Sequence, residues 1–327
     1  MKVLITTKYN EQCLKELRER FDEVKCMPAK DIRSRKEDEM LEFLSQEKPD
    51  ALIVELDKVT KNVLEANPNL SFVGVCRANP VNVDVETASK LGIPVLVTPA
   101  RNAQAVAELV VGQLIMLERN LFDAVPWLKD GSWVENPAYP FFNYKGHEIH
   151  GKKVGFIGFG AVARSLWKIL NAFGCEGYYY DAFVSDEIDG CKPSSLEDIL
   201  KNCDIVSVHL PVTPSTKGMI TRKLLSLMKA DAIFVNSARA DVVDYDALYD
   251  LLLNKKIRGA CIDVYVSEPP SEADYKLIKL ENVLATPHIA GAAYEIEDHH
   301  SRIMNNAVFE WIDKKQGRCV FNLKDLK

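Results

Sequence analysis

The chain has 327 residues, of which 47% are hydrophobic and 27% are charged. This composition excludes collagen-like, disordered and disulfide-scaffold proteins. The length favours two domains, each large enough to bury its own core. The 47 acidic side chains outnumber the 41 basic ones, and no long basic run offsets the net charge of −6. Because such a chain repels phosphate backbones, we expect no nucleic-acid partner.

The eight cysteines are scattered and form no Cys-x-x-Cys pair, so we expect free thiols in a reducing compartment. The first residues, from Met1 to Thr7, become polar too early for a signal peptide. The most apolar run, residues 109–117, is about half the length of a membrane span. These features predict a soluble cytoplasmic protein that does not bind a membrane.

Short apolar runs alternate with amphipathic stretches over the first hundred residues. Helical patterns occupy 14–21 and 85–91. The runs typical of strands are residues 3–5, 51–54, 72–75 and 93–97. Alternation of this kind predicts a parallel sheet with helices on both faces.

A long helix is predicted for residues 102–119, where apolar residues recur at a spacing of three to four and Gln113 interrupts them. Residues 123–144 differ, because they hold three prolines and six aromatic residues. Such a segment is typical of an interface or of packing onto the chain's own core. Strand–helix alternation then resumes over 153–287, and residues 292–316 predict a final helix.

A glycine pattern at residues 158–163 follows an apolar strand and begins a helix. Gly158 permits a tight turn, Gly160 lets a pyrophosphate approach the backbone, and Ala163 allows close helix–strand packing. The next predicted strand ends in Asp181, which lies 21 residues beyond Gly160. An acid at this spacing binds the adenosine ribose and repels a 2′-phosphate, so we expect NAD rather than NADP. A glycine turn without a ligand is the alternative.

Several further segments resemble the D-isomer-specific 2-hydroxyacid dehydrogenase family, notably its phosphoglycerate dehydrogenase-like members, over nearly the whole chain. The matching segments are 105–108, 208–211 with Thr213 and Thr216, 236–239, 263–269 and 286–291. The resemblance implies an α/β protein of two doubly wound parallel-sheet domains. A Rossmann NAD-binding domain, residues 101–291, would be inserted into a flavodoxin-like substrate domain, residues 1–100 and 292–327. It also implies a homodimer.

The resemblance assigns catalysis to Arg239, Glu268 and His288. A planar guanidinium at Arg239 can hold a carboxylate and polarise a carbonyl, whereas an ordinary surface arginine is the alternative. His288 would exchange the proton that reduction of a 2-keto acid requires. Glu268 would hold the other ring nitrogen and favour the protonated form, or would instead be an acid at a helix start.

The matched positions also give a cofactor site. Asp263 is expected to face the nicotinamide carboxamide, with a buried capping aspartate as the alternative. The complete predicted set is Gly158, Gly160, Ala161, Val162, Asp181, His209, Pro211, Thr216, Ala238, Asp263 and Gly291. His147 and His150, like Glu295 and His299, have helical spacing, but two ligands without a third are typical of surface chemistry. We therefore expect no metal.

One segment, residues 76–84, departs from the glycine-rich substrate loop of many members of the family. The backbone amides of Ala78 and Asn79 can still bind a substrate carboxylate, and the side chains of Arg77 and Asn79 add donors. Arg77 then contacts a larger, phosphorylated or polyhydroxylated substrate, or forms an ion pair with a neighbour. The substrate-binding set is thus Arg77, Ala78, Asn79 and Arg239.

Together these features predict a cytoplasmic NAD-dependent enzyme that interconverts a 2-keto acid and a D-2-hydroxy acid. An NAD-responsive binding protein of the corepressor type is the alternative, because such proteins share the fold and retain the arginine, glutamate and histidine. Formate dehydrogenase is a weaker rival, since that branch has glutamine at the position of Glu268.

Overall fold

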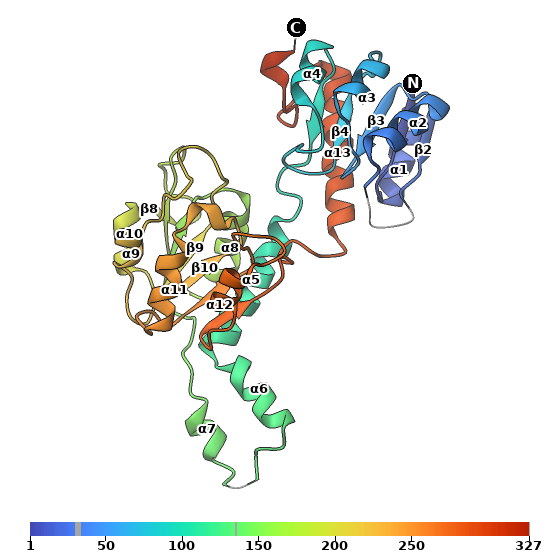
Figure 1. The fold of residues 1–327 in the computed structure, drawn as a ribbon. Helices are drawn as coiled ribbons and strands as arrows, with labels where there is room; N and C mark the ends of the chain where they lie inside the picture. Colours follow the sequence, from blue (N-terminus) through green and yellow to red (C-terminus); the bar gives the residue numbers. More distant parts are fainter. Residues whose placement is uncertain (30–33, 135, 327) are drawn as a thin grey trace. The chain divides into compact units, whose positions relative to one another are not determined.

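The computed structural model describes residues 1–29, 34–134 and 136–326, and it divides the chain into two compact units (Figure 1). Unit 1 comprises Met1–Arg101 and Ala293–Lys327, and unit 2 comprises Asn102–Ala292. The chain therefore crosses between the units twice. The predicted boundaries, 1–100 with 292–327 and 101–291, lie one residue from these crossings.

Unit 1 contains a five-stranded parallel sheet with the order β2-β1-β3-β4-β5. Its strands are β1 (Lys2–Ile5), β2 (Glu23–Cys26), β3 (Ala51–Val54), β4 (Val73–Val75) and β5 (Val95–Val97). Its helices are α1 (Glu11–Arg18), α2 (Glu37–Glu47), α3 (Lys61–Ala66), α4 (Val85–Lys90) and α13 (Ile296–Lys314), with a short turn of 3₁₀ helix, η2 (Leu323–Asp325). This strand order is that of the flavodoxin-like fold, as predicted.

Helices cover both faces of this sheet because its central strands are buried on both sides. Leu17 of α1 and Met304 of α13 pack on one face, and Leu44 of α2 and Leu64 of α3 pack on the other. Gly74 in β4 makes the close approach of α13 possible, since a Cβ there would lie 2.8 Å from the sulfur of Met304. The final helix thus completes the core of the first hundred residues.

Unit 2 contains a seven-stranded parallel sheet with the order β12-β11-β10-β9-β6-β7-β8. Its strands are β6 (Lys153–Ile157), β7 (Glu176–Tyr180), β8 (Lys192–Pro193), β9 (Ile205–Val208), β10 (Ile233–Asn236), β11 (Gly259–Ile262) and β12 (Val283–Ala285). This is the Rossmann order with one strand added, and the order reverses between β6 and β9. Ligands of such sheets bind at the carboxyl ends of the strands, near that reversal.

The helices of unit 2 also cover both faces of its sheet. They are α5 (Ala103–Glu118), α6 (Leu121–Lys129), α7 (Tyr139–Asn143), α8 (Ala161–Ala172), α9 (Leu196–Asn202), α10 (Arg222–Leu225), η1 (Ala240–Val242), α11 (Tyr245–Leu253) and α12 (Glu272–Ile278). Val110 of α5 and Leu166 of α8 pack on one face. Ile199 of α9 and Leu248 of α11 pack on the other.

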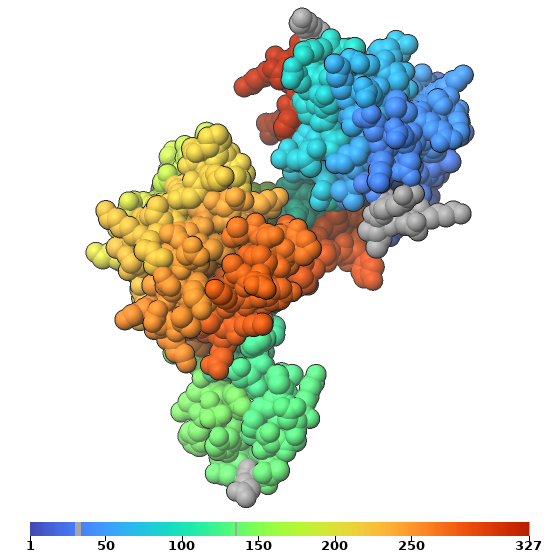
Figure 2. All heavy atoms as spheres, viewed as in Figure 1, coloured from blue at the N-terminus to red at the C-terminus, as the bar shows by residue number. Residues whose placement is uncertain are grey.

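The proline-rich segment forms α6 and α7, which extend away from the sheet of unit 2 (Figures 1 and 2). Neither helix contains a buried residue. The Trp127 ring contacts the rings of Trp133, Tyr139 and Tyr144, while Phe141 is 71% exposed. Of the two interpretations offered by the sequence, packing onto the chain's own core does not apply to the described part of this segment.

All eight cysteines are free. Within the described residues, no helix is long and apolar enough to cross a membrane. The same part of the chain has no group of three or more His, Cys, Asp or Glu side chains placed to hold a metal ion.

Candidate active site

The glycine turn lies between β6 and α8. Gly158 has a φ of +89°, and a Cβ there would lie 3.0 Å from the carbonyl oxygen of His209. Gly160 is the N-cap of α8, and an added Cβ would meet no atom within 4 Å. Because the first amides of a helix have no intrahelical partner, those of Ala161 and Val162 are available to an anion at this open end.

Asp181 lies beside this turn, directly after β7. Its Oδ2 accepts a hydrogen bond of 2.7 Å from the Phe159 amide, and its Oδ1 accepts one of 2.8 Å from the Phe183 amide. Since an ionised carboxylate has about four acceptor positions, two bonds fix the group and leave capacity for ribose hydroxyls. The predicted glycine turn and acid are therefore brought together.

The segment after β9 lies on the other side of the strand-order reversal. His209 Nε2 lies 2.8 Å from Ser207 Oγ, and burial of the ring lowers the pKa of His209 to about 3. The ring is thus neutral near pH 7. Thr216 Oγ1 donates to the Pro211 carbonyl at 2.6 Å and closes the loop that follows.

Arg239 follows β10 at the same edge of the sheet. The buried Asn236 side chain fixes this turn, because its Oδ1 accepts from the Ala238 amide and its Nδ2 donates to the Arg239 carbonyl, both at 3.0 Å. The Arg239 guanidinium is exposed and donates through Nη1 to the Ala238 carbonyl at 2.6 Å. Nearby, the buried Ser237 Oγ has no hydrogen-bond partner among the described residues.

His288 and Glu268 are in contact, although twenty residues separate them. His288 Nδ1 lies 2.7 Å from Glu268 Oε2. Glu268 Oε1 accepts a hydrogen bond of 3.3 Å from the Tyr265 amide. With Nδ1 directed at the carboxylate, Nε2 is the nitrogen left to exchange a proton with a substrate. The two side chains are 41% (Glu268) and 45% (His288) exposed, so both reach solvent.

Asp263, after β11, is 1% exposed and anchors the segment that carries His288. Its carboxylate accepts three hydrogen bonds, from Thr286 Oγ1 at 2.6 Å, the Ile289 amide at 2.9 Å and the Ala290 amide at 2.8 Å. These bonds fit a buried capping aspartate, which the sequence analysis gave as the alternative to a contact with the nicotinamide.

Gly291 lies against the start of α5, because a Cβ at this position would lie 2.6 Å from Asn102 Nδ2. Strand order explains how all these residues gather. Arg239, Glu268 and His288 follow β10, β11 and β12, which are neighbours in the sheet. The parallel strands direct their carboxyl ends to one edge, where the glycine turn, Asp181 and His209 also lie.

Three observations indicate that an NAD molecule fits this edge of the sheet. The N-terminus of α8 is open at Gly160, the Asp181 carboxylate lies beside the turn, and the unpaired Ser237 Oγ marks a polar position beyond β10. These features suit the pyrophosphate, the adenosine ribose and a polar end of a dinucleotide, respectively.

The predicted substrate loop of unit 1 follows β4 at the carboxyl edge of the other sheet. Ala78 and Asn79 are exposed, while Arg77 is half-buried and has an interaction partner. The backbone of Arg77 is tied in place, since its carbonyl accepts from the Thr98 amide at 2.9 Å. The loop is therefore anchored at Arg77 and open at the two residues that follow.

A polar group at this edge of unit 1 was not predicted from the sequence. Glu55, directly after β3, pairs with Arg101 at 2.9 Å and accepts a hydrogen bond of 3.0 Å from Thr7 Oγ1. Arg101 Nη1 also lies 3.3 Å from His300 Nδ1, while His300 Nε2 lies 2.9 Å from the Lys8 carbonyl. The available signal was an acid directly after a predicted strand.

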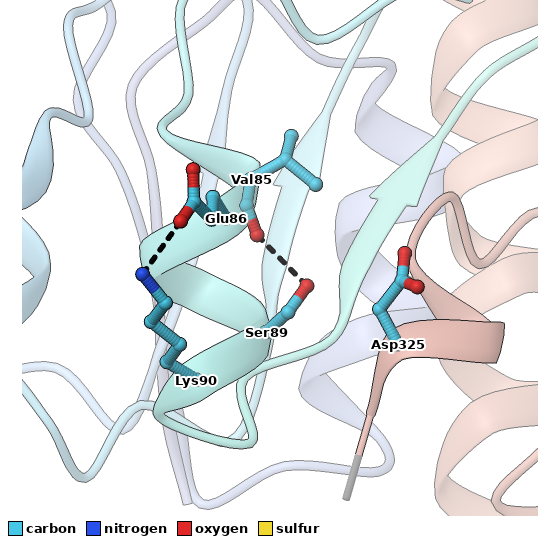
Figure 3. Close-up of a pocket in the computed structure, with 5 residues that line it drawn as sticks. All are labelled: Val85, Glu86, Ser89, Lys90 and Asp325. Atoms are coloured by element: carbon cyan, nitrogen blue, oxygen red, sulfur yellow. Dashed lines mark hydrogen bonds and ion pairs between the residues drawn. The ribbon is translucent and has the colours of Figure 1, made fainter.

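Two surface depressions hold none of the predicted site residues. One, of about 430 Å³, is lined by Val85, Glu86, Ser89, Lys90 and Asp325 (Figure 3). There Lys90 pairs with Glu86 at 2.6 Å, and Ser89 Oγ donates to the Val85 carbonyl at 2.8 Å. The other, of about 200 Å³, lies at α10 and α11 of unit 2, where Arg222 and Asp250 are paired. These contacts point to no further ligand.

Comparisons with known proteins decide the family. A sequence model described as "D-isomer specific 2-hydroxyacid dehydrogenase, NAD binding domain" matches residues 111–290, more than half of the chain. The Bacillus subtilis (strain 168) protein named as 2-hydroxyacid dehydrogenase YoaD is 48% identical over 316 residues, which cover 96% of this chain and 92% of that protein. The chain belongs to this dehydrogenase family.

Two further likenesses place the dehydrogenase among its relatives. D-3-phosphoglycerate dehydrogenase of Methanocaldococcus jannaschii is 32% identical over 331 residues, which cover 100% of this chain but 60% of that protein. The solved structure of D-2-hydroxyisocaproate dehydrogenase has a TM-score of 0.82 at 21% identity, covering 98% of this chain and 99% of that one. At this identity the second likeness shows the fold alone.

The dehydrogenase is therefore an NAD-dependent oxidoreductase with the two-domain α/β fold of its family. The predicted family, fold class, enzyme class and cofactor are confirmed. The substrate, the roles of individual residues, the homodimer and the cytoplasmic location stay predictions.

Proposed function

We propose that the dehydrogenase interconverts a 2-keto acid and a D-2-hydroxy acid, with His288 as the proton-exchanging group. The contact of 2.7 Å between His288 Nδ1 and Glu268 Oε2 carries this proposal. A carboxylate at Nδ1 fixes the ring orientation and leaves Nε2 for the substrate oxygen.

The reduction adds a hydride to the carbonyl carbon and a proton to its oxygen. When bound, NADH supplies the hydride. His288 Nε2 donates the proton, and the Glu268 carboxylate balances the imidazolium until the proton leaves. In the oxidation direction His288 accepts the hydroxyl proton through the same nitrogen, as a general base.

Arg239 binds the substrate carboxylate and polarises the neighbouring carbonyl. Asn236 holds this turn by donating to the Arg239 carbonyl and accepting from the Ala238 amide, so the guanidinium projects from a fixed point. A planar guanidinium can form two parallel bonds to a carboxylate and still direct a donor at the adjacent oxygen.

The cofactor-binding residues divide between two sides of β6. The turn at Gly158 and Gly160, with Ala161 and Val162, binds the pyrophosphate, and Asp181 binds the adenosine ribose. On the nicotinamide side we propose His209, Pro211, Thr216, Ala238, Asp263 and Gly291. The Asp263 carboxylate already accepts three hydrogen bonds from residues 286–290, so it would bind the cofactor through its remaining acceptor position.

In unit 1 we propose that Ala78 and Asn79 offer backbone amides to the substrate carboxylate and that Arg77 addresses a distal anionic or hydroxyl group. A second copy of the chain is the proposed partner, with the exposed aromatic segment of α6 and α7 as the contact. A reducing, cytoplasmic location agrees with the eight free cysteines.

A panel of 2-keto acids tests the function, with NADH consumption followed at the nicotinamide absorbance. We expect turnover with at least one acid and a D-2-hydroxy acid as product, identified by chiral chromatography. An L product, or no turnover with any acid while NADH binds normally, would contradict the proposal.

A further inference from the structure

A buried polar chain in unit 2 connects α5 to the segment that carries His288. Gln113 is 4% exposed, and with Glu118 it is one of two polar side chains among the buried residues of α5. Its Nε2 donates to Thr286 Oγ1 at 3.1 Å, and Thr286 Oγ1 donates to Asp263 Oδ1 at 2.6 Å. Burying an amide is unfavourable unless it is hydrogen-bonded, so this glutamine requires a physical explanation.

The direction of this chain is fixed by the chemistry of its members. An amide nitrogen can only donate, and a hydroxyl has one proton to give. Thr286 therefore accepts from Gln113 and gives its own proton to Asp263. The hydrogen bond from the Gln113 amide thus orients the Thr286 hydroxyl so that its proton points at the Asp263 carboxylate.

Asp263 also accepts two hydrogen bonds from the backbone that follows His288. The amides of Ile289 and Ala290, which follow His288 directly, donate to its two oxygens at 2.9 and 2.8 Å. His288 itself has a φ of +53°. A residue with a side chain rarely adopts this left-handed conformation, which persists where neighbouring contacts determine it.

The residue before Pro287 is held from a second direction. The Thr286 carbonyl accepts from Tyr265 Oη at 2.7 Å and from the His288 amide at 3.0 Å. The Tyr265 amide in turn donates to Glu268, the partner of the imidazole. One short segment, 263–268, therefore holds both the backbone and the ring of His288.

We propose that Gln113 is a positioning residue for His288, acting through Thr286 and Asp263 to hold the left-handed backbone from which Nδ1 meets Glu268. This inference rests on the proposed role of His288. Gln113 touches neither the imidazole nor Glu268, so its effect is on the geometry of the proton-exchanging group.

Gln113→Met tests the proposal, because methionine has a similar volume and no donor. We expect kcat in the direction of keto acid reduction to fall about 3- to 10-fold, the loss expected from one buried hydrogen bond, with the KM for NADH unchanged. Gln104→Met is the matched control, since Gln104 is exposed on the same helix and its side chain donates to Glu108 of that helix. It should leave kcat unchanged.

A readout independent of turnover reports the geometry directly. The Nδ1 proton between His288 and Glu268 should give a downfield proton NMR resonance, assigned by its absence in His288→Ala. We expect this resonance to broaden or disappear in Gln113→Met and to persist in Gln104→Met. Where Gln113→Met does not fold, Thr286→Val removes the central hydroxyl of the hydrogen-bonded series Gln113–Thr286–Asp263. Thr286→Ser keeps that hydroxyl and should keep the resonance and the rate.

Combining Gln113→Met with His288→Ala distinguishes a failure of this inference from a failure of the proposed function. In a His288→Ala background, Gln113→Met should cause no further loss of rate. If His288→Ala keeps full activity, the proposed function fails. Two results would contradict the positioning role once His288→Ala has lost activity. In the first, Gln113→Met keeps both the wild-type rate and the resonance. In the second, Gln113→Met lowers the residual rate of His288→Ala by the same factor as it lowers the wild-type rate.

Discussion

At the scale of single residues, the site depends on side chains whose hydrogen bonds fix one orientation. Asn236 fixes the turn before Arg239, and Glu268 fixes the ring of His288. The residue types and their order could be predicted from the sequence. The contact between Glu268 and His288 was expected only from the family resemblance. The residues alone do not show it, because the meeting of positions 268 and 288 depends on β11 and β12 being neighbours in the sheet.

His209 makes the stability of unit 2 depend on pH. Its folded pKa of about 3 lies below the unfolded value, so the unfolded chain binds a proton first as pH falls. Stability is therefore full above about pH 6.5 and falls toward pH 3, by at most about 1.4 kcal/mol per unit. Urea unfolding at pH 7 and 4.5 should show a loss about 2–3 kcal/mol larger in wild type than in His209→Gln. Equal losses would contradict this assignment.

Arg77 should affect large substrates more than small ones. Losing a charged hydrogen bond typically costs about tenfold or more in affinity, so Arg77→Ala should raise the KM for the best substrate by about that factor. Glyoxylate has no distal group, and its reduction should change little. Steady-state kinetics with both acids, and with Arg77→Lys as the charge-retaining control, provides the measurement. Equal losses on both acids would make Arg77 a carboxylate ligand or a structural residue.

At the scale of elements, the strand–turn–helix unit of β6 and α8 was the most predictable part of the site. Each small residue has a visible reason, such as the positive φ of Gly158 and the open N-cap at Gly160. Of the two edge strands of unit 1, β5 was predicted and β2 was not. In β2 the sequence Glu-Val-Lys-Cys contains two charged residues, and no residue of this strand is buried, so the strand has little apolar signal.

The end of β7 should set the preference for NADH. Asp181→Ser with Ala182→Arg removes the carboxylate and adds a cation for a 2′-phosphate, so the ratio of kcat/KM for NADPH to that for NADH should rise at least tenfold. The single variant Asp181→Asn, which keeps the shape, should lose NADH affinity without gaining NADPH. If the wild-type enzyme already uses both cofactors equally well, the role of Asp181 is wrong.

The α6–α7 segment should hold two copies of the chain together. Phe141 and Phe142 are 71% and 64% exposed, so replacing both with serine removes apolar contact area without disturbing a core. Sedimentation should show a dimer in wild type and a monomer, or a dimer at least tenfold weaker, in the double variant. Tyr275→Ser, at an exposed aromatic residue of α12, should remain dimeric. A wild-type monomer would contradict the proposed partner.

At the scale of the whole molecule, strand–helix alternation was enough to predict two parallel sheets with helices on both faces. The predicted helices 102–119 and 292–316 correspond to α5 and α13, although α13 begins only at Ile296, since residues 292–295 form the crossing and a turn. The Glu55–Arg101–His300 group was missed because its members come from both parts of unit 1. Such contacts depend on the fold as a whole.

The central claim is that His288 exchanges the proton and that Glu268 acts through it. A double-mutant cycle on kcat, measured across pH with the best keto acid, tests this most directly. Removing a general acid typically costs about 10²–10⁴-fold, so His288→Ala should lose most turnover while its NADH affinity stays nearly intact. Glu268→Gln keeps the shape of the side chain but removes the carboxylate that holds Nδ1, so kcat should also fall.

Residues that act as one unit have strongly non-additive effects. The double variant should therefore be hardly slower than His288→Ala alone. Fully multiplicative losses would show that Glu268 acts independently of His288, and an unchanged kcat in His288→Ala would contradict the mechanism.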